Sequence, residues 1–163
     1  MVFLMTTAIN SLINLLKAQQ LMAGCAESCT GGLLASLLTH NSGSSTWFEA
    51  GFVTYSNDAK TKMLGVPADL INHYGAVSIE VAHAMVQGVL THCKADTAVS
   101  ITGIAGPTGG SIEKPVGTVC FGFAYHDKPI MTLKHQFHET SREAIREAAC
   151  EFVCLQWLAY LKN

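Results

Sequence analysis

Apolar residues recur at helical spacing close to the start of the chain. Four of them follow one another at intervals of three or four residues: Ile9, Leu12, Ile13 and Leu16. This spacing predicts an amphipathic helix over 8–20. The apolar run 21–26 then predicts a short strand, and the amphipathic run 33–39 predicts a second helix. A tight, polar turn must join this strand to this helix.

Strands and helices go on alternating through the middle of the chain. The pattern predicts a strand over 47–55, a short helix capped by Ser56 or Asn57 and ended by Gly65, one or two helical turns over 67–74, a helix over 78–93 and a buried strand over 98–102. Such alternation is typical of a parallel sheet.

The last third of the chain predicts two longer strands and a terminal helix. Runs 116–125 and 130–137 are separated by four residues, 126–129, so we expect them to pair as a hairpin. Thr140 to Glu143 match a capping box at the start of the last helix. The second half of that helix is apolar nearly all round, and we expect it to be covered on both sides, by the core and by a second subunit.

This order of elements predicts an α/β fold. We expect a three-layer α/β/α sandwich on a mixed, mostly parallel sheet with an antiparallel hairpin member. No internal repeat, low-complexity tract or linker interrupts residues 1–163, so we expect a single domain.

The composition narrows the classes of partner. Hydrophobic residues make up 49% of the 163 positions and charged residues only 13%, with a formal net charge of −2. This balance provides no field that would attract nucleic acid or an acidic membrane, and no apolar run is long enough to span a bilayer. The scarcity of charge favours a surface covered by another copy, so we expect a homo-oligomer, with a dimer favoured.

The cysteines indicate a reducing compartment. All six are spread through predicted helices and strands rather than framing loops. The apolar stretch 2–5 is too short for a signal peptide, and no basic residue precedes it. We therefore expect reduced thiols and a cytoplasmic location.

The first candidate for chemistry is the turn 26–32, between the first strand and its helix. A turn of small residues at a helix start leaves backbone N–H groups free to hold an anion, with the Ser28 hydroxyl beside them. Alternatively, Ser28 or Thr30 only caps the helix, which is what such residues usually do. Taken alone, this turn favours the capping interpretation.

The second candidate is Lys60, in the first turn of the helix that follows Tyr55. The helix dipole disfavours a cation at this position, and together with burial it would lower the pKa of the amine from about 10.4 towards that of a usable base. Alternatively, the stem of Lys60 lies on Tyr55 and its ammonium group points to water. Taken alone, the position favours the solvent-exposed interpretation.

The third candidate is the loop 103–110, directly after the predicted strand 98–102. Ligands bind at the carboxyl ends of strands in open α/β sheets, and glycines let the backbone approach a ligand closely. The loop is neither a Walker A sequence nor a Gly-x-Gly-x-x-Gly fingerprint. A wide surface loop is the alternative, although two glycine-dense turns that each follow a short strand favour a site.

Other nucleophiles and metal ligands have weaker support. Cys29 would point differently from Ser28, and no histidine is indicated beside it. Cys150 and Cys154 lie four residues apart in the apolar terminal helix, where core thiols are the simpler interpretation. The seven histidines show no ligand spacing. We therefore expect no metal and no cofactor.

Five motifs, taken in order, resemble those of one family. They are Ala-Glu-Ser-Cys-Thr-Gly-Gly at 26–32, Trp-Phe-Glu-Ala-Gly-Phe-Val-Thr-Tyr-Ser-Asn at 47–57, Gly-Ala-Val-Ser at 75–78, Ile-Thr-Gly-Ile-Ala-Gly-Pro-Thr-Gly-Gly at 101–110 and Lys-Pro-Val-Gly-Thr-Val at 114–119. Through them the chain resembles the CinA C-terminal domain family over nearly its whole length. Stand-alone members of that family are nicotinamide-nucleotide amidases.

The resemblance implies hydrolysis of the carboxamide of nicotinamide mononucleotide (NMN) to nicotinate mononucleotide and ammonia, in pyridine-nucleotide salvage and without a metal. It implies Ser28 as the nucleophile, Lys60 as the general base and Tyr55 as an assisting residue. Backbone N–H groups around residues 30–32 would hold the oxyanion. The candidate substrate-binding residues are Thr30, Gly31, Gly32, Ser45, Thr102, Gly103, Gly106, Gly109, Gly110 and Arg142.

The chain departs from the family over 137–142, where the family usually has a shorter Gly-Asp-Arg turn. The arginine expected at the substrate phosphate is therefore Arg142 or, if the longer turn displaces it, Arg146. Two other classes of function stay open: a nucleotide-binding or accessory domain without turnover, and a structural module that assembles through its last helix. The presence of Ser28, Tyr55 and Lys60 together favours the amidase.

Overall fold

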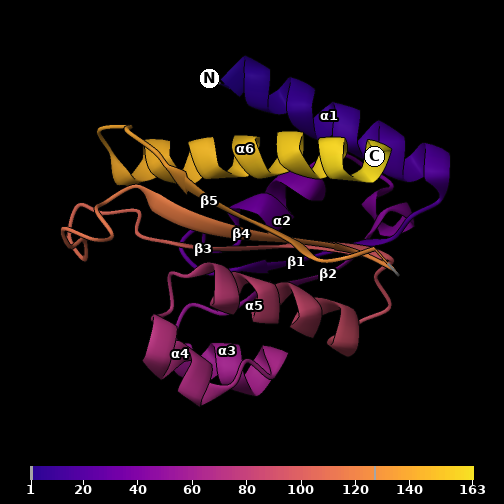
Figure 1. The fold of residues 1–163 in the computed structure, drawn as a ribbon. Helices are drawn as coiled ribbons and strands as arrows, with labels where there is room; N and C mark the ends of the chain where they lie inside the picture. The colour runs from indigo at the N-terminus through magenta and orange to yellow at the C-terminus, as the bar shows by residue number, and fades with distance from the viewer. Residues whose placement is uncertain (1, 127) are drawn as a thin grey trace.

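Five strands form a central sheet, and helices cover both of its faces (Figure 1). The computed structural model describes residues 2–126 and 128–163, with side chains from residue 7 onward. β1 pairs in parallel with β2 and β3, whereas β4 is antiparallel to β3 and β5. The expected mixed, mostly parallel sheet with an antiparallel hairpin member is confirmed. In spatial order the strands are β2 (Phe48–Val53), β1 (Ala23–Glu27), β3 (Thr97–Gly103), β4 (Thr118–Tyr125) and β5 (Met131–Gln136).

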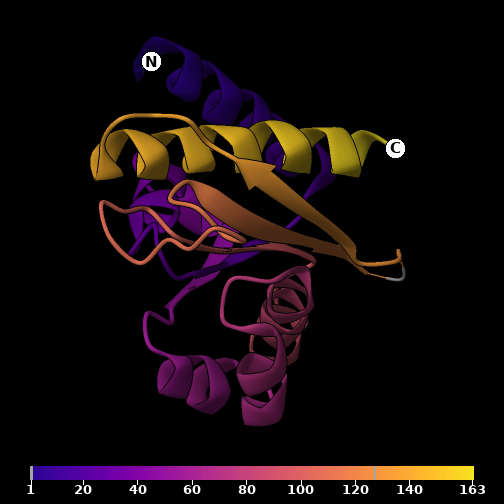
Figure 2. The same cartoon turned by 60° about the vertical axis from the view of Figure 1, so that its left-hand side comes forward.

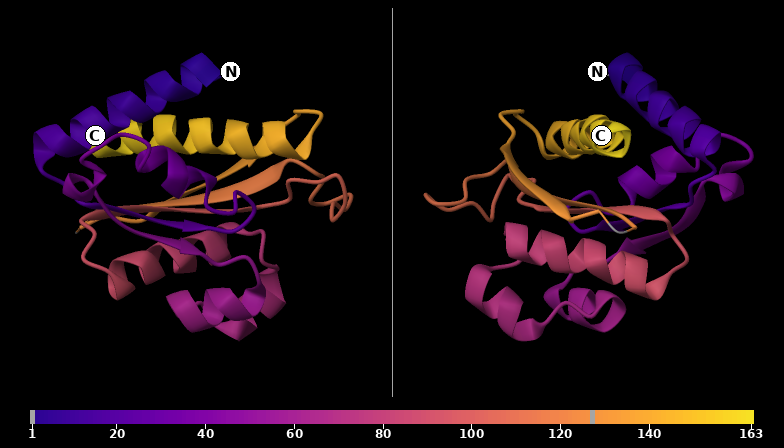
Figure 3. Two further views of the ribbon diagram at one scale, coloured as in Figure 1. Left: turned by 180° about the vertical axis from the view of Figure 1, so that it is seen from behind. Right: turned by 45° about the vertical axis from the view of Figure 1, so that its right-hand side comes forward.

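Two helical layers enclose the sheet (Figures 2 and 3). Each layer closes its own apolar core on one face, so the predicted three-layer α/β/α sandwich is confirmed. One layer holds α1 (Val2–Gln19), α2 (Leu33–Leu38) and α6 (Arg142–Lys162), and the other holds α3 (Asn57–Leu64), α4 (Ala68–Tyr74) and α5 (Ile79–His92).

The terminal helix α6 is covered from two directions within the chain. Its buried residues, such as Val153 and Trp157, belong to the core on the sheet, and α1 packs against α6 as a second cover (Figure 1). The sequence pattern indicated a second cover but did not reveal that α1 provides it. Leu155 stays 47% exposed, and a contact with a second subunit stays a prediction.

Most predicted helix ends agree with the structure. Ser56 caps α3 by accepting a hydrogen bond from the N–H of Ala59 at 3.0 Å, and Gly65 ends the helix with a φ of +70°. The cap of α6 lies one residue later than predicted, because Ser141 accepts the N–H of Ala144 at 3.1 Å. Within the predicted hairpin turn 126–129, residue 127 lies outside the described residues.

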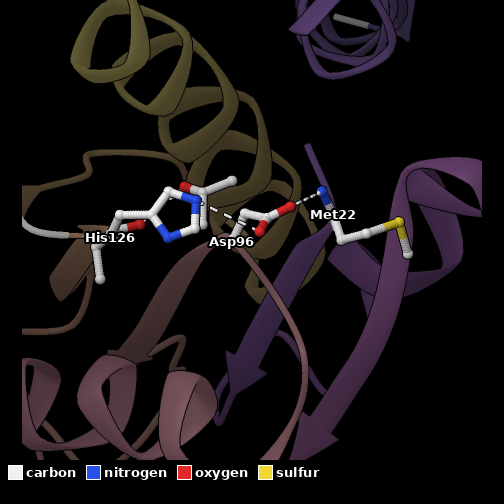
Figure 4. Close-up of polar contacts among 5 residues, drawn as sticks. Met22, Asp96 and His126 are labelled. Carbon is white, nitrogen blue, oxygen red and sulfur yellow. Dashed lines mark hydrogen bonds and ion pairs between the residues drawn. The ribbon is translucent and has the colours of Figure 1, made fainter. Parts of the chain in front are cut away.

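Asp96 ties two strands together at one end of the sheet (Figure 4). One of its carboxylate oxygens accepts the N–H of Met22 at 2.7 Å, just before β1. The other lies 3.4 Å from Nε2 of His126, just after β4. Because β4 runs opposite to β1, both contacts fall at the amino edge of the parallel strands. The glycine-rich loop leaves β3 at the other, carboxyl edge.

A close approach between two helices fixes α3 in place. Gly88 of α5 leaves no room for a side chain, because a Cβ there would collide with the carbonyl oxygen of Leu64 in α3. We predict that Gly88→Ala lowers the free energy of unfolding by about 1–3 kcal/mol, although alanine is the better helix former. Chemical denaturation measures this loss. Gln87→Ala, at an exposed position beside it, is the control, and equal stability of both variants would contradict the close packing.

Candidate active site

A pocket of about 350 Å³ opens at the carboxyl ends of β1 and β3. Its walls come from the turn after β1, the start of α3, the loop between β3 and β4 and the first residue of α6. Figure 1 shows the β3–β4 loop and the start of α6 at the same end of the sheet. The glycine-rich loop therefore lies where open α/β sheets usually bind ligands.

Ser28 directly follows β1 and is held by the neighbouring strand. Its N–H donates to the carbonyl oxygen of Ile101 at 2.9 Å, which continues the pairing of β1 with β3. The chain then turns sharply, with a φ of +60° at Gly31 and +95° at Gly32, values that glycine adopts without strain. Ser28 is thereby placed in the wall of the pocket, and 8% of the residue is exposed.

Two of the backbone N–H groups predicted to hold an oxyanion already form hydrogen bonds within the protein. The N–H of Gly31 donates to the carbonyl oxygen of Ser28 at 3.1 Å, and that of Gly32 donates to a buried carboxylate at 3.1 Å. Neither is free to hold an oxyanion, so the expectation is wrong for Gly31 and Gly32. In the part of the chain that the structure describes, the N–H groups of Cys29 and Thr30 donate to no other residue.

Lys60 lies in the first turn of α3, and its side chain extends to Ser28. Only 1% of the residue is exposed, and its Nζ donates to Oγ of Ser28 at 2.9 Å. Nζ also donates to the carbonyl oxygens of Thr54 at 2.9 Å and of Tyr55 at 3.4 Å. The interpretation in which the ammonium group points to water is therefore wrong.

Burial lowers the pKa of Lys60 from its ordinary value, because the charged amine loses its hydration. Among the described residues no carboxylate lines the pocket to oppose this effect. In the neutral amine, the two N–H bonds go to the two carbonyl oxygens, and the lone pair is left for the Ser28 hydroxyl. Such an arrangement can activate a hydroxyl group as a nucleophile.

Tyr55 and Arg142 are joined at the wall of the pocket. Nη2 of Arg142 donates to the Tyr55 hydroxyl at 2.8 Å, and Nη1 donates to the carbonyl oxygen of Gly106 at 2.7 Å. The guanidinium group thus connects α6 to the turn after β2 and to the glycine-rich loop. Of the two arginines left open by the sequence, Arg142 lines the pocket, whereas Arg146 donates to the carbonyl oxygen of Thr30 at 2.7 Å.

The β3–β4 loop supplies much of the remaining wall. Oγ1 of Thr102 donates to the carbonyl oxygen of Ala76 at 2.8 Å, which holds the segment 75–78 beside the pocket. Sequence reasoning missed Ala76, Val77 and Asn57 as lining residues. The segment 75–78 carried only a motif, and Asn57 was considered only as a helix cap. The lining residues from the end of β3 and the loop after it are Thr102, Gly103, Ile104, Ala105, Gly106, Thr108 and Gly109.

Five candidate substrate-binding residues do not line this pocket. The Thr30 side chain is fully buried, and Gly31 and Gly32 lie outside the walls. Gly110 lines a separate hollow formed by residues 107–112, 115 and 116. Ser45 lies in the short 3₁₀ turn before β2, and therefore at the amino edge of the sheet, opposite the pocket.

Cys29 lines the pocket beside Ser28 as a neutral thiol. Burial raises the pKa of Cys29 to about 11, so the reactive thiolate is scarce at neutral pH. Burial also raises the pKa of Cys150 and of Cys154 in α6. Within residues 2–126 and 128–163, no group of three or more His, Cys, Asp or Glu side chains is placed to hold a metal ion. None of the described helices is both long and apolar enough to cross a membrane.

The fold and the pocket together define an α/β/α domain with a pocket of small-molecule size at the carboxyl edge of its parallel strands. The chain belongs to the CinA C-terminal domain family, because the model of that family matches residues 5–161.

Similar proteins cover most of the chain. A protein of Enterobacter agglomerans named nicotinamide-nucleotide amidohydrolase PncC is 56% identical over 137 residues, which are 84% of this chain and 83% of that relative. A protein of the same name from Escherichia coli (strain K12) is 48% identical over 91% of this chain and 90% of its own length. The crystal structure of the competence/damage inducible protein CihA from Agrobacterium tumefaciens, 39% identical, matches 98% of this chain and 96% of that chain with a TM-score of 0.93.

Proposed function

We propose that this protein hydrolyses the carboxamide of NMN, releasing ammonia and nicotinate mononucleotide in pyridine-nucleotide salvage. The observation that carries the proposal is the 2.9 Å contact between Nζ of buried Lys60 and Oγ of Ser28. An amide is a poor electrophile, so its hydrolysis needs an activated nucleophile, and a neutral amine beside a hydroxyl group supplies one. The names of the two amidohydrolase relatives support the choice of substrate.

The first half of the reaction forms an ester on Ser28. Its Oγ attacks the carboxamide carbon while Nζ of neutral Lys60 takes the hydroxyl proton. Negative charge develops on the amide oxygen, and the N–H of Cys29, which lines the pocket and donates to no other described residue, stabilises it. Lys60 then gives its proton to the leaving nitrogen, which departs as ammonia when the C–N bond breaks.

The second half of the reaction releases the acid. A water molecule enters the place of ammonia and gives one proton to neutral Lys60 as its oxygen attacks the ester carbon. The C–O bond to Ser28 then breaks, and Lys60 returns the proton to Oγ. The scheme uses the Ser28 hydroxyl, the Lys60 amine, one backbone N–H group and water.

The charge of the pocket fits an anionic nucleotide. Arg142 is cationic, and none of the described residues that line the pocket is acidic. Glycines of the loop 103–109 leave its backbone accessible, and exposed N–H groups bind phosphate oxygens well. We therefore place the substrate phosphate near Arg142 and the loop, and the carboxamide at Ser28.

We predict that Arg142→Met raises KM for NMN about 10- to 100-fold, because a hydrogen bond from a charged group contributes about 1.5–3 kcal/mol. Steady-state kinetics measures this change. Arg146→Met is the matched control, since Arg146 lies on the same helix but does not line the pocket. We expect its KM to stay within about threefold of the wild-type value. Equal increases for both variants would contradict the placement of the phosphate.

Ammonia release from NMN by the wild-type protein, with a chelator present, tests the proposed function. We expect ammonia and nicotinate mononucleotide in equal amounts, at a rate that the chelator does not change. Nicotinamide riboside, which lacks the phosphate, should be a poorer substrate. If NMN raises the melting temperature but yields no ammonia, the protein is a nucleotide-binding module and the proposal is wrong.

A further inference from the structure

Glu27 is a buried carboxylate directly before Ser28, and the proposed reaction does not use it. The residue ends β1 and has no exposed surface. Its Oε2 accepts the N–H groups of Gly32 and Leu34, both at 3.1 Å, and its Oε1 accepts the N–H of Ala35 at 2.8 Å. The thiol of Cys25 also donates to Oε1, at 3.8 Å. The N-cap residue of α2 is Gly32, which has no side chain to cap the helix. The carboxylate of Glu27 therefore takes the place of a side-chain cap in the first turn of α2.

A carboxylate in this place costs stability. Removing a charge from water is unfavourable unless other groups replace its hydration, and backbone N–H groups do so here. Among the described residues, no Lys, Arg or His forms an ion pair with Glu27. An apolar residue with a conventional side-chain cap on α2 would avoid the cost. The carboxylate therefore calls for a role beyond packing.

Two hydrogen bonds connect the backbone of Glu27 to Lys60 through Thr54. The carbonyl oxygen of Glu27 accepts the N–H of Thr54 at 2.8 Å, and the carbonyl oxygen of Thr54 in turn accepts Nζ of Lys60 at 2.9 Å. The backbone of Glu27, which is bonded to Ser28, is therefore hydrogen-bonded to the backbone of Thr54, which holds Lys60. A shift of Glu27 would move both Ser28 and Lys60, and would so change the distance between Oγ and Nζ.

The carboxylate of Glu27 also occupies several backbone N–H groups after Ser28 and leaves others without a partner among the residues described. It takes those of Gly32, Leu34 and Ala35, and the N–H of Gly31 turns back to Ser28. The N–H of Cys29, which lines the pocket next to Ser28 in the sequence, donates to no other described residue. Glu27 thus helps to fix the shape of the turn that carries both the nucleophile and this N–H group.

We propose that Glu27 is a positioning residue for catalysis: its carboxylate holds the Ser28 turn so that Oγ meets Nζ of Lys60 and the N–H of Cys29 faces the reacting oxygen. The proposal rests on the proposed Ser28–Lys60 reaction. Because the substrate phosphate is placed on the other wall, at Arg142 and the glycine-rich loop, loss of Glu27 acts on kcat rather than on KM.

Glu27→Gln tests this role with little change in size. Whichever way the amide is turned, its NH₂ group faces at least one backbone N–H, so one or two of the three bonds are lost. We expect kcat for NMN to fall about 100-fold, as for a displacement of about 1 Å at a reacting group, with KM within about threefold. The matched control is Asp96→Asn, which changes a carboxylate that accepts a backbone N–H at the opposite end of β1. We expect its kcat within about twofold of the wild-type value.

A second measurement separates this proposal from the choice of substrate. A small alkyl fluorophosphonate labels Ser28 without using the nucleotide subsite: an Oγ–P bond forms, the P–F bond breaks, fluoride leaves and Lys60 takes the hydroxyl proton. We expect Glu27→Gln to lower the rate constant of labelling by about the same factor as kcat. A merely structural role would lower the final labelled fraction but leave the rate constant of the folded molecules unchanged.

Each outcome decides the question. Labelling that slows in Glu27→Gln, even if the wild-type protein does not hydrolyse NMN, supports the positioning role and rejects only the substrate. If a folded Glu27→Gln protein keeps the labelling rate constant and the kcat of the wild type, the positioning role is wrong, and the proposed amidase activity is unaffected. If that variant does not fold, Glu27→Asp, one methylene shorter with the charge kept, is expected to show the same loss of rate. Failure of both variants to fold, or a wild-type protein that is never labelled, also overturns the role.

Discussion

Replacing Ser28 with alanine is expected to lower kcat for NMN by about 10³-fold or more, while the protein still folds and still binds NMN. The change removes the oxygen that forms the ester, and the other catalytic groups cannot substitute for a nucleophile. Lys60 keeps two carbonyl partners, so the cost to the free energy of unfolding is about 1 kcal/mol, that of one hydrogen bond. Ammonia release measures turnover, and the melting temperature with and without NMN measures folding and binding.

Ser36→Ala is the control for this prediction. Ser36 is an exposed serine of α2, the helix that follows the Ser28 turn, so its loss changes neither the turn nor the pocket. We expect wild-type kinetics from it. Turnover by Ser28→Ala within about tenfold of the wild-type value would mean that water attacks the carboxamide directly, and the ester intermediate would be wrong.

Local features of the site were predictable from the sequence. The turn at Ser28 and the helix start at Lys60 follow from strand-to-helix patterns that occupy only a few neighbouring residues, and the structure has both. The glycine-rich loop after β3 was likewise placed at the carboxyl edge by the order of elements alone. In each case the deciding interactions lie within one turn or one strand end, where local sequence determines structure.

Contacts between distant segments were not predictable in the same way. The buried position of Lys60 involves a contact with Ser28, 32 residues away along the chain, and no pattern around Lys60 encodes it. The expected roles of Gly31 and Gly32 as oxyanion donors failed because the N–H of Gly32 already binds the carboxylate of Glu27, and that of Gly31 donates to the carbonyl oxygen of Ser28.

Ser45 shows a second limit of sequence reasoning. A motif places a residue near another along the chain but does not say at which edge of the sheet it lies. Ser45 comes before β2, whereas the residues of the pocket come after their strands, so the direction of β2 puts it at the wrong edge. A residue that precedes a strand can reach the carboxyl edge only through a long loop, and only two residues separate Ser45 from Phe48.

Lys60→Met is expected to lower kcat for NMN by between about 10² and 10⁴-fold, the usual contribution of a general base. Methionine fills a similar volume but can neither take the Ser28 proton nor give one to the leaving nitrogen. In the wild-type protein, the neutral amine is the active form, so kcat should rise with pH through a pKa below the ordinary value for lysine. The variant should show no such rise. A pH series of kcat measures both effects.

The stability of the protein should report the same pKa. Burial lowers the pKa of Lys60 in the folded protein, so between that pKa and the ordinary value the unfolded chain binds more protons than the folded one. The free energy of unfolding of the wild-type protein therefore rises with pH across this window. Lys60→Met lacks the titrating group, so its stability relative to the wild type should fall as pH rises through the window. Denaturant titrations at several pH values measure the difference.

Lys62→Met is the matched control, two residues further along the same helix. Lys62 forms a 2.8 Å ion pair with Asp58, the two side chains being 73% and 70% exposed, and this contact raises the pKa of Lys62. An exposed pair of this kind contributes little to stability, so kcat and its pH profile should stay as in the wild type. If kcat were independent of pH in all three proteins, or if Lys62→Met lost the rise and Lys60→Met kept it, Lys60 would not be the base. The buried amine would then act only by holding the Ser28 hydroxyl in place.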